Sequence, residues 1–386
     1  MTLRTLLMFL ALLPAAGVLA IEAEKPAEPP DLKYDWGIAY YLSYDNNLGP
    51  AMPIIVKAIR SGVSANAIAA VQVDMPGPGG MQRVALIGGE DSKVIKLASD
   101  DSADENQAIA YFEWFVKTYP CKHYGFFFLD HGGDLDQMCA DVNPDTKDKF
   151  FMSGRVLGEK LRAFKATLKS GNIDLLFFQQ CGRGSLENLY SFRGIADCVL
   201  ISPVNVGAPN TYYTPLHQWL GLHPDATGKD VAAKIAAEDK DYSVYTCINS
   251  AKIDDIPSKL DLALKPILEK PAPKLPARTP AVYAHSGTNE STVDLKAYLE
   301  ALSAANGAAT EAAAFQKWID EELIVKRYIQ KDHAELDKTH CGLAFFVPNN
   351  VDEAAKYSAM DLYKKSTLGA LWKKLFPAKT AAALQK

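Results

Sequence analysis

The sequence predicts an α/β fold, a three-layer α/β/α sandwich with a mostly parallel central sheet. Three observations predict it. Several short segments are continuously apolar, which is typical of strands buried on both faces of a sheet. Segments with a helical apolar period alternate with such strands between residues 105 and 201. The chain has 386 residues, 48% of them hydrophobic, which is enough for one large domain with a substantial core.

The N-terminus has the pattern of a secretory signal peptide. A basic start at Arg4 precedes the almost wholly apolar residues 6–19, and the small residue Ala20 ends the segment. We predict a signal peptide over residues 1–20, cleaved after Ala20, and a linker over residues 21–34. The apolar stretch is short for a membrane span, which needs about 20 residues. We therefore expect an exported product, periplasmic or extracellular, with no membrane anchor after cleavage.

The predicted core begins with a strand and continues through a helix into a hairpin. Residues 36–42 form an aromatic and aliphatic run, which indicates a buried strand. Residues 52–59 have a helical pattern. Residues 69–74 and 83–87 flank a long turn rich in proline and glycine, which predicts a pair of antiparallel strands.

Amphipathic helices and continuously apolar strands then alternate three times. The first of these helices has acidic residues at its start and Lys117 at its end, in agreement with the helix dipole. The strands are too continuously apolar to have a face in water. The predicted helices cover residues 105–118, 156–168 and 185–192, and the predicted strands cover residues 124–129, 173–178 and 198–201. We place this core at residues 35–255.

The C-terminal region, residues 256–386, has weaker patterns and is expected to pack on the core. Its proline-rich residues 270–280 predict a surface connection. Helices are predicted over residues 229–239, at the end of the core, and over residues 258–268, 311–336 (one or two helices) and 354–375, and a late strand is predicted over residues 343–348.

Composition and charge exclude several classes of partner. The 41 basic and 46 acidic residues leave a formal net charge of −5, and the chain has no long run of lysine and arginine. A nucleic acid partner is therefore not expected. None of the six cysteines belongs to a C-x-x-C pair, which argues against a zinc knuckle, and their pairing cannot be assigned from their spacing.

Two of the predicted strands end in residues that can carry chemistry. His131 follows the strand over residues 124–129, and Cys181 follows the strand over residues 173–178. Ligands of an open α/β sheet bind beyond the carboxyl ends of its strands, so both residues are predicted at one rim of the sheet. A cysteine nucleophile reacts as a thiolate, and a neighbouring imidazole or helix N-terminus lowers the pKa of the thiol. The backbone N–H groups of Gly132 and Cys181 are the candidates for an oxyanion hole in acyl transfer.

A purely structural interpretation stays open on pattern alone. A single cysteine at a strand end is most often a small packed hydrophobe. A histidine before a glycine in a turn is more often structural than catalytic. The joint placement of His131 and Cys181 at equivalent strand ends favours the chemical interpretation.

Several motifs resemble the clostripain-type cysteine peptidases, a bacterial branch of the caspase-like fold. The 50-residue interval between His131 and Cys181 is that of the caspase signature. Residues 129–132 are similar to the family's W-D-H-G, and residues 181–190 are similar to its C-L-M-x-x-x-E-x-x-Y. Further similar segments are residues 40–48, 111–120, 245–249 and 342–348. The resemblance covers residues 36–348 and implies a caspase-like sandwich.

The resemblance also implies roles for the two residues. Cys181 would be the nucleophile and His131 the general base of an exported cysteine endopeptidase that hydrolyses peptide bonds in a peptide or protein substrate. We expect a monomer. The alternative is a catalytically inactive caspase-like binding or scaffold module, motivated by Gln179 and Asn249, where the family usually has aspartate. Transpeptidation by the same acyl-enzyme would use the same residues.

The specificity pocket is where this sequence departs from the family. Family members carry an aspartate two residues before the cysteine, where this chain has Gln179, and no second acidic residue is evident in residues 202–213. Gln179, Ser202 and Asn205 are therefore expected to line a neutral pocket. Because a charge-assisted hydrogen bond is about twice as strong as a neutral one, we expect a specificity that is not strictly for arginine or lysine.

The residues leave two further family properties open. Calcium dependence occurs in relatives, and Asp45, Asp134 and Asp136 are acidic loop residues that could bind a hard cation. No ligand spacing identifies a metal site, so Ca²⁺ is implied by the resemblance only and no other cofactor is expected. Relatives are often cut in the loop after the histidine strand, which here contains Lys147 and Lys149. We expect self-cleavage at these lysines to be disfavoured in this chain, because Gln179 replaces the aspartate of the specificity pocket.

Overall fold

A mixed sheet forms the centre of the computed structural model, which describes residues 31–77, 80–88, 90–143, 149–169, 171–277, 282–283, 290 and 292–376. The strand order in the described part of the chain is β14-β11-β10-β9-β6-β1-β2-β3-β4, with β5 paired to β3. These strands are β1 (Tyr34–Ser43), β2 (Ala67–Asp74), β3 (Gln82–Ile87), β4 (Glu90–Asp91), β5 (Ile95–Lys96), β6 (Cys121–Leu129), β9 (Asn172–Gln179), β10 (Cys198–Ile201), β11 (Val244–Asn249) and β14 (Ile324–Ile329). The predicted signal peptide lies outside the described residues.

The middle of the sheet is parallel and its edges are antiparallel. Strands β2, β1, β6, β9 and β10 run in one direction, whereas β3, β11 and β14 each run antiparallel to their neighbours. The predicted hairpin is confirmed as β2 and β3. The α/β class and the mostly parallel core of the sheet are therefore confirmed.

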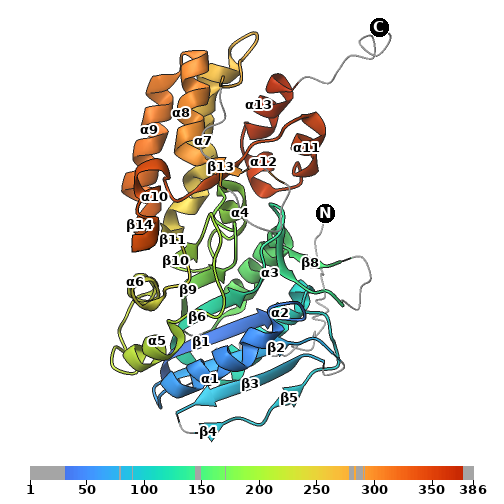
Figure 1. The fold of residues 1–386 in the computed structure, drawn as a ribbon, viewed down its shortest axis with the longest axis vertical. Helices are drawn as coiled ribbons and strands as arrows, with labels where there is room; N and C mark the ends of the chain where they lie inside the picture. Colours follow the sequence, from blue (N-terminus) through green and yellow to red (C-terminus); the bar gives the residue numbers. More distant parts are fainter. Residues whose placement is uncertain are drawn as a thin grey trace, which may run out of the picture.

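Helices cover both faces of the sheet (Figure 1). One face packs against α1 (Met52–Gly62), α5 (Tyr213–Leu220) and α6 (Gly228–Glu238), and the other packs against α2 (Glu105–Thr118), α3 (Gly154–Thr167) and α4 (Leu186–Ser191). Helix α7 (Ile256–Leu268) packs mainly against helices of the C-terminal region. Successive residues of a strand point to opposite faces, so Phe127 joins one core cluster while Phe126 and Phe128 join the other. This alternation explains why the central strands are apolar at every position.

Helix α2 shows how the local sequence signals act. The Asp104 side chain caps the helix by accepting a hydrogen bond from the backbone N–H of Asn106 at 2.9 Å. Phe112 lies on the buried face and stacks on Phe126 of the sheet, with ring centroids 4.2 Å apart. The bounds predicted for this helix are those of the structure.

The C-terminal region forms a helical layer with a small sheet of its own (Figure 1). Its helices are α8 (Leu295–Asn306), α9 (Ala309–Trp318), α10 (Leu336–Thr339), α11 (Val351–Lys356), α12 (Asp361–Lys365) and α13 (Leu368–Leu375). Its sheet contains β12 (Val282–Tyr283), β13 (Thr292–Asp294) and β15 (Ala344–Phe346). The predicted late strand corresponds to β15, which pairs with β13 and not with the central sheet.

The range predicted to hold one or two helices, residues 311–336, contains most of α9 but also a strand that was not predicted. Residues 324–329 form strand β14, which pairs antiparallel with β11 at the edge of the central sheet. The β-branched and aromatic residues of this segment favour a strand, but its partner is distant in sequence, so the pairing gives no local periodic signal. Helix α5, strand β11 and the hairpin of β7 (Gln137–Ala140) and β8 (Phe151–Ser153) were also not predicted.

Candidate active site

Strands β6 and β9 bring His131 and Cys181 to one rim of the sheet. The two strands are parallel neighbours, and Leu129 of β6 is in register with Gln179 of β9. The histidine and the cysteine each follow two residues after these paired positions. They therefore leave the sheet side by side, as the sequence analysis predicts.

Gly132 fixes the contact between the two loops. A Cβ atom added to this glycine would lie 2.0 Å from the backbone oxygen of Cys181, which is far closer than any non-bonded contact allows. Only a residue without a side chain fits between the two strand ends. The backbone N–H groups of Gly132 and Cys181 remain the predicted oxyanion hole.

The imidazole of His131 is oriented by an asparagine. Its Nε2 lies 2.7 Å from Oδ1 of Asn47, in the loop after β1. An amide oxygen only accepts a hydrogen bond, so this contact places the proton on Nε2 and leaves Nδ1 unprotonated and basic. Burial lowers the pKa of His131 below its ordinary value, so the ring is neutral at pH 7.

The loop that carries Asn47 is held in place by the side chain of the preceding residue, Asn46. Its amide Nδ2 donates to Oδ1 of Asp130 at 2.8 Å and to the backbone oxygens of Ser43 at 2.8 Å and Ala140 at 3.1 Å. Asp130 also accepts a hydrogen bond from the Ala140 N–H. The residue directly before His131 is thus tied both to the loop after β1 and to the end of β7. A role for these asparagines was not predicted, and the only signal for it in the sequence is that Asn46 and Asn47 are adjacent.

The thiol of Cys181 contacts the backbone of Val206. The Val206 N–H donates to Sγ at 3.3 Å, and Sγ lies 3.6 Å from the Val206 oxygen. Burial raises the pKa of Cys181, and the Val206 amide and the Arg183 charge offset this only in part. The resting thiol is therefore protonated at neutral pH. The lowered thiol pKa expected from a neighbouring imidazole and a helix N-terminus is not found.

Arg183 joins the loop after Cys181 to the loop after His131. The side chain is 1% exposed, so its hydrogen bonds are shielded from water. Burial lowers the pKa of Arg183 to about 10, which leaves it cationic at neutral pH. Its guanidinium donates to five backbone oxygens, those of Gly133, Asp134, Leu135, Gln137 and Cys181. This contact was not predicted from the sequence.

Gln179 lies in a buried network of neutral groups. Its Oε1 accepts from the hydroxyls of Tyr212 at 2.6 Å and Tyr213 at 3.2 Å, and its Nε2 donates to Asn210. Asn210 in turn donates to Asp239 at 2.7 Å. Both oxygens of Asp239 already accept hydrogen bonds, from Asn210, Thr211, Asp241 and Tyr245. The Asp239 carboxylate at the end of this network is therefore occupied by donors within the protein.

The other two residues predicted for the specificity pocket differ in exposure. Ser202 is fully buried, and its hydroxyl donates a hydrogen bond to the backbone oxygen of Val204 and accepts one from the Val204 N–H. Asn205 is exposed in the loop next to Val206, the residue that contacts the Cys181 thiol. Asn205 therefore lies nearer to solvent than Gln179 or Ser202.

The three acidic loop residues that could bind a cation, Asp45, Asp134 and Asp136, lie at two separate places in the structure. Asp134 binds Lys356 at 2.8 Å, and Asp136 accepts from the Ser153 hydroxyl at 2.6 Å and the Arg155 N–H at 2.7 Å. A cavity of about 450 Å³ lies beside these two aspartates, and neither His131 nor Cys181 lines it.

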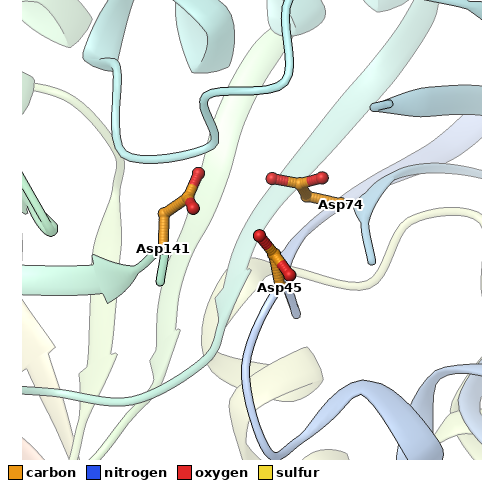
Figure 2. A group of neighbouring side chains, drawn as sticks. All are labelled: Asp45, Asp74 and Asp141. Carbon is orange, nitrogen blue, oxygen red and sulfur yellow. The ribbon is translucent and has the colours of Figure 1, made fainter. Parts of the chain in front are cut away.

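Asp45 instead gathers with Asp74 and Asp141 (Figure 2). All three carboxylates are buried, and burial raises the pKa of Asp74 to about 8. In the part of the chain that the structure describes, they are the only group of three or more histidine, cysteine, aspartate or glutamate residues whose ligand atoms lie close enough together to hold one metal ion.

Two other predictions concern cysteines and lysines. All six cysteines are free thiols, five of them buried and Cys181 partly exposed. Lys149 is paired with the buried Glu105, and Lys147 lies outside the described residues.

Within the described residues, no helix is both long enough and apolar enough to cross a bilayer.

A cysteine and a histidine at adjacent carboxyl ends of parallel strands, within a three-layer sandwich, define a caspase-like cysteine-type peptidase. The clostripain family model, that of the C11 peptidases, matches residues 79–376. The chain therefore belongs to the clostripain family. No curated protein matches it.

Solved structures of C11 proteases have the same fold. An inactive zymogen C11 protease from Parabacteroides distasonis is 16% identical with a TM-score of 0.65, and the match covers 86% of this chain and 98% of that chain. A secreted C11 cysteine protease from Bacteroides thetaiotaomicron, in complex with an irreversible peptide inhibitor, is 16% identical with a TM-score of 0.61, and the match covers 86% and 99%. These likenesses confirm the caspase-like sandwich.

Proposed function

We propose that this protein is an exported cysteine endopeptidase in which Cys181 is the nucleophile and His131 the general base. The observation that carries the proposal is the adjacent placement of these residues on β6 and β9, with Asn47 leaving Nδ1 of the histidine free to accept a proton. Positioned proton transfer of this kind accelerates reactions by about 10²–10⁴.

The proposed reaction follows from these groups. His131 Nδ1 takes the thiol proton as Sγ of Cys181 attacks the peptide carbonyl, and the N–H groups of Gly132 and Cys181 stabilise the oxyanion. The protonated histidine then gives its proton to the leaving amine. Water, deprotonated by the same histidine, hydrolyses the acyl-enzyme and restores the thiol.

A peptide library and an alkylating agent test the assignment. We expect turnover by the mature chain, none by Cys181→Ala, and at least a hundredfold loss in His131→Ala. Iodoacetamide should label Cys181 selectively, since the other five cysteines are buried, and more slowly in His131→Ala. Turnover that survives in Cys181→Ala would refute the proposal.

One observation favours the alternative of a catalytically inactive binding module, namely the protonated thiol held by Val206. Under this alternative, peptides bind but are not cleaved. Binding of library peptides without turnover by the wild-type chain would establish it, so the same experiment separates the two functions.

The proposed specificity is for uncharged side chains and not strictly for arginine or lysine. The support is the neutral network around Gln179 and the full occupancy of Asp239 by internal donors. We expect neutral reporter peptides to be cleaved with higher kcat/KM than arginyl ones. Equal or better cleavage of the arginyl reporter would contradict this specificity.

Export is proposed from the N-terminal pattern of residues 1–20 and from the similarity to a C11 protease described as secreted. Expression of the full chain in a bacterium should give a periplasmic or extracellular protein that begins at Ile21. N-terminal sequencing of that product tests the cleavage site.

A further inference from the structure

Three buried aspartates from separate segments meet near the active-site loops. Asp45 follows β1, Asp74 ends β2 and Asp141 follows β7, and their side chains are 3%, 1% and 0% exposed. One carboxylate oxygen from each lies within 4.8 Å of the others. Figure 2 shows the three carboxylate groups gathered around a common space. We call them the aspartate triad.

Several oxygens of the aspartate triad have no hydrogen-bond partner. Neither carboxylate oxygen of Asp74 accepts a hydrogen bond, and Oδ1 of Asp45 accepts none. The ion pairs of the described residues include no lysine or arginine bound to any of the three. A buried carboxylate without donors or a countercharge is unfavourable, so these oxygens are suited to a ligand that supplies positive charge.

The remaining oxygens of the triad are held in place by the backbone and by Asn143. Asp141 accepts from the N–H groups of Ser102 at 2.9 Å and Asn143 at 2.8 Å. Oδ2 of Asp45 accepts from the Asn143 side chain at 3.0 Å. These bonds fix two of the three carboxylates, so the arrangement is preorganised and is not an accidental contact of flexible side chains.

The spacing and chemistry favour calcium. Two oxygens bound to one Ca²⁺ ion at about 2.3–2.6 Å are separated by at most about 5 Å, and the triad oxygens fall within this limit. Ca²⁺ is bound by carboxylates and carbonyls in flexible geometry, whereas Mg²⁺ keeps several waters and takes few protein ligands. A fully buried set of three carboxylates is therefore better matched to Ca²⁺.

We propose that the aspartate triad binds a Ca²⁺ ion and that this ion orders the loop which holds Asn47 against His131. Asp45 is directly followed by Asn46 and Asn47, the first bound to Asp130 and the second to His131. On the other side, Asp141 follows Ala140, whose backbone also binds Asn46 and Asp130. An ion bound to both Asp45 and Asp141 would therefore hold in place the two segments that contact Asp130 and His131. The second part of this proposal rests on the proposed function of that histidine.

Metal binding is tested in the mature Cys181→Ala chain, so that the result does not depend on peptidase activity. After removal of metal with EDTA, Ca²⁺ at about 100 times its dissociation constant should raise the melting temperature by about 4 °C. Mg²⁺ at the same concentration should raise it less. Bound Tb³⁺ should show luminescence on tyrosine excitation, because two tyrosines lie near the triad. Tyr44 precedes Asp45, and the Tyr41 hydroxyl binds the Ser102 backbone at 3.0 Å. Ca²⁺ should displace the Tb³⁺ and remove this signal.

Two substitutions give the sharpest comparison. Asp74→Asn removes one carboxylate ligand from the triad, so it should lose the response to Ca²⁺ and Tb³⁺. Asp134→Asn, a matched change at the aspartate bound to Lys356, should keep both responses. If Asp74→Asn does not fold by circular dichroism, Asp45→Asn takes its place.

The outcomes separate the two parts of the proposal. No Ca²⁺ response in the Cys181→Ala chain, a response retained in Asp74→Asn, or an equal response to Mg²⁺ would overturn the Ca²⁺ site. In the catalytically competent chain, EDTA should lower kcat/KM at least tenfold and Ca²⁺ should restore it. A chain that binds Ca²⁺ but has the same kcat/KM with and without it would refute the link to His131.

Discussion

Nε2 of His131 lies 2.7 Å from Oδ1 of Asn47, a residue 84 positions earlier in the chain. This contact decides which ring nitrogen carries the proton. It gives the proposed base a fixed orientation without a carboxylate, so that the histidine stays neutral until it takes the proton of Cys181.

Asn47→Ala should lower kcat by about 10–100-fold with little change in KM, because it releases the orientation of the base but no group that binds substrate. Asn47→Asp should keep the orientation and move the acidic limb of the pH–kcat/KM profile to higher pH, since a carboxylate favours the charged imidazolium. Steady-state kinetics from pH 5 to 9 measure both effects. An unchanged profile in both variants would show that the contact has no part in catalysis.

Alkylation of Cys181 should depend steeply on pH. Burial raises the thiol pKa, and the lowered pKa of His131 keeps the ring uncharged, so no thiolate–imidazolium pair forms at rest. The rate with iodoacetamide should therefore increase about tenfold per pH unit between pH 6 and 8. Mass spectrometry of the labelled peptide gives the rate, with Cys181→Ala as background. A rate that is constant over this range would mean that the resting site already contains the ion pair.

Arg183→Met should destabilise the protein by about 3–5 kcal/mol, because it leaves buried backbone oxygens on two loops without their donor. Activity should fall even at temperatures where the variant is folded, since both loops border the thiol. Urea unfolding and kcat/KM measure the two effects. Arg155→Met is the control, because this partly exposed arginine of α3 pairs with Glu159 at the surface, and it should change stability by less than about 1 kcal/mol. Equal stability of the two variants would contradict the role assigned to Arg183.

Glu187→Gln should stabilise the protein more at pH 8 than at pH 5. This buried carboxyl on α4 has a pKa raised to about 8 by desolvation, whereas its ordinary value is 4.5. Between these values the unfolded chain has released the proton that the folded chain keeps, so wild-type stability falls as pH rises, by at most about 1.4 kcal/mol per unit. Glutamine removes this loss. Urea unfolding at both pH values is the measurement, with the exposed Glu311→Gln as control, and equal effects at the two pH values would argue against the raised pKa.

Much of the fold could be predicted because its signals are local. Continuous apolar runs mark the central strands, and the caps and periodicity of α2 mark its ends. The placement of His131 and Cys181 follows from the same signals, since parallel strands share one rim. Strand β14 could not be predicted in this way, because its stability comes from pairing with β11 and not from its own pattern.

The supports of the site were hidden for a related reason. Asn47, Arg183 and Val206 each have an ordinary local interpretation, as a turn asparagine, a loop arginine and a loop hydrophobe. Their roles come from partners that are 25 to 84 residues away and are defined only by the folded chain. The aspartate triad likewise joins three segments with no common spacing.

Because β14 closes one edge of the central sheet, the peptidase core and the C-terminal layer share a single backbone ladder. A protease that nicked the proline-rich connection near residue 275 would produce two fragments that remain bound to each other without a covalent link. Separating them would require denaturant, and truncating the chain at this point would expose the β11 edge to pairing with other molecules.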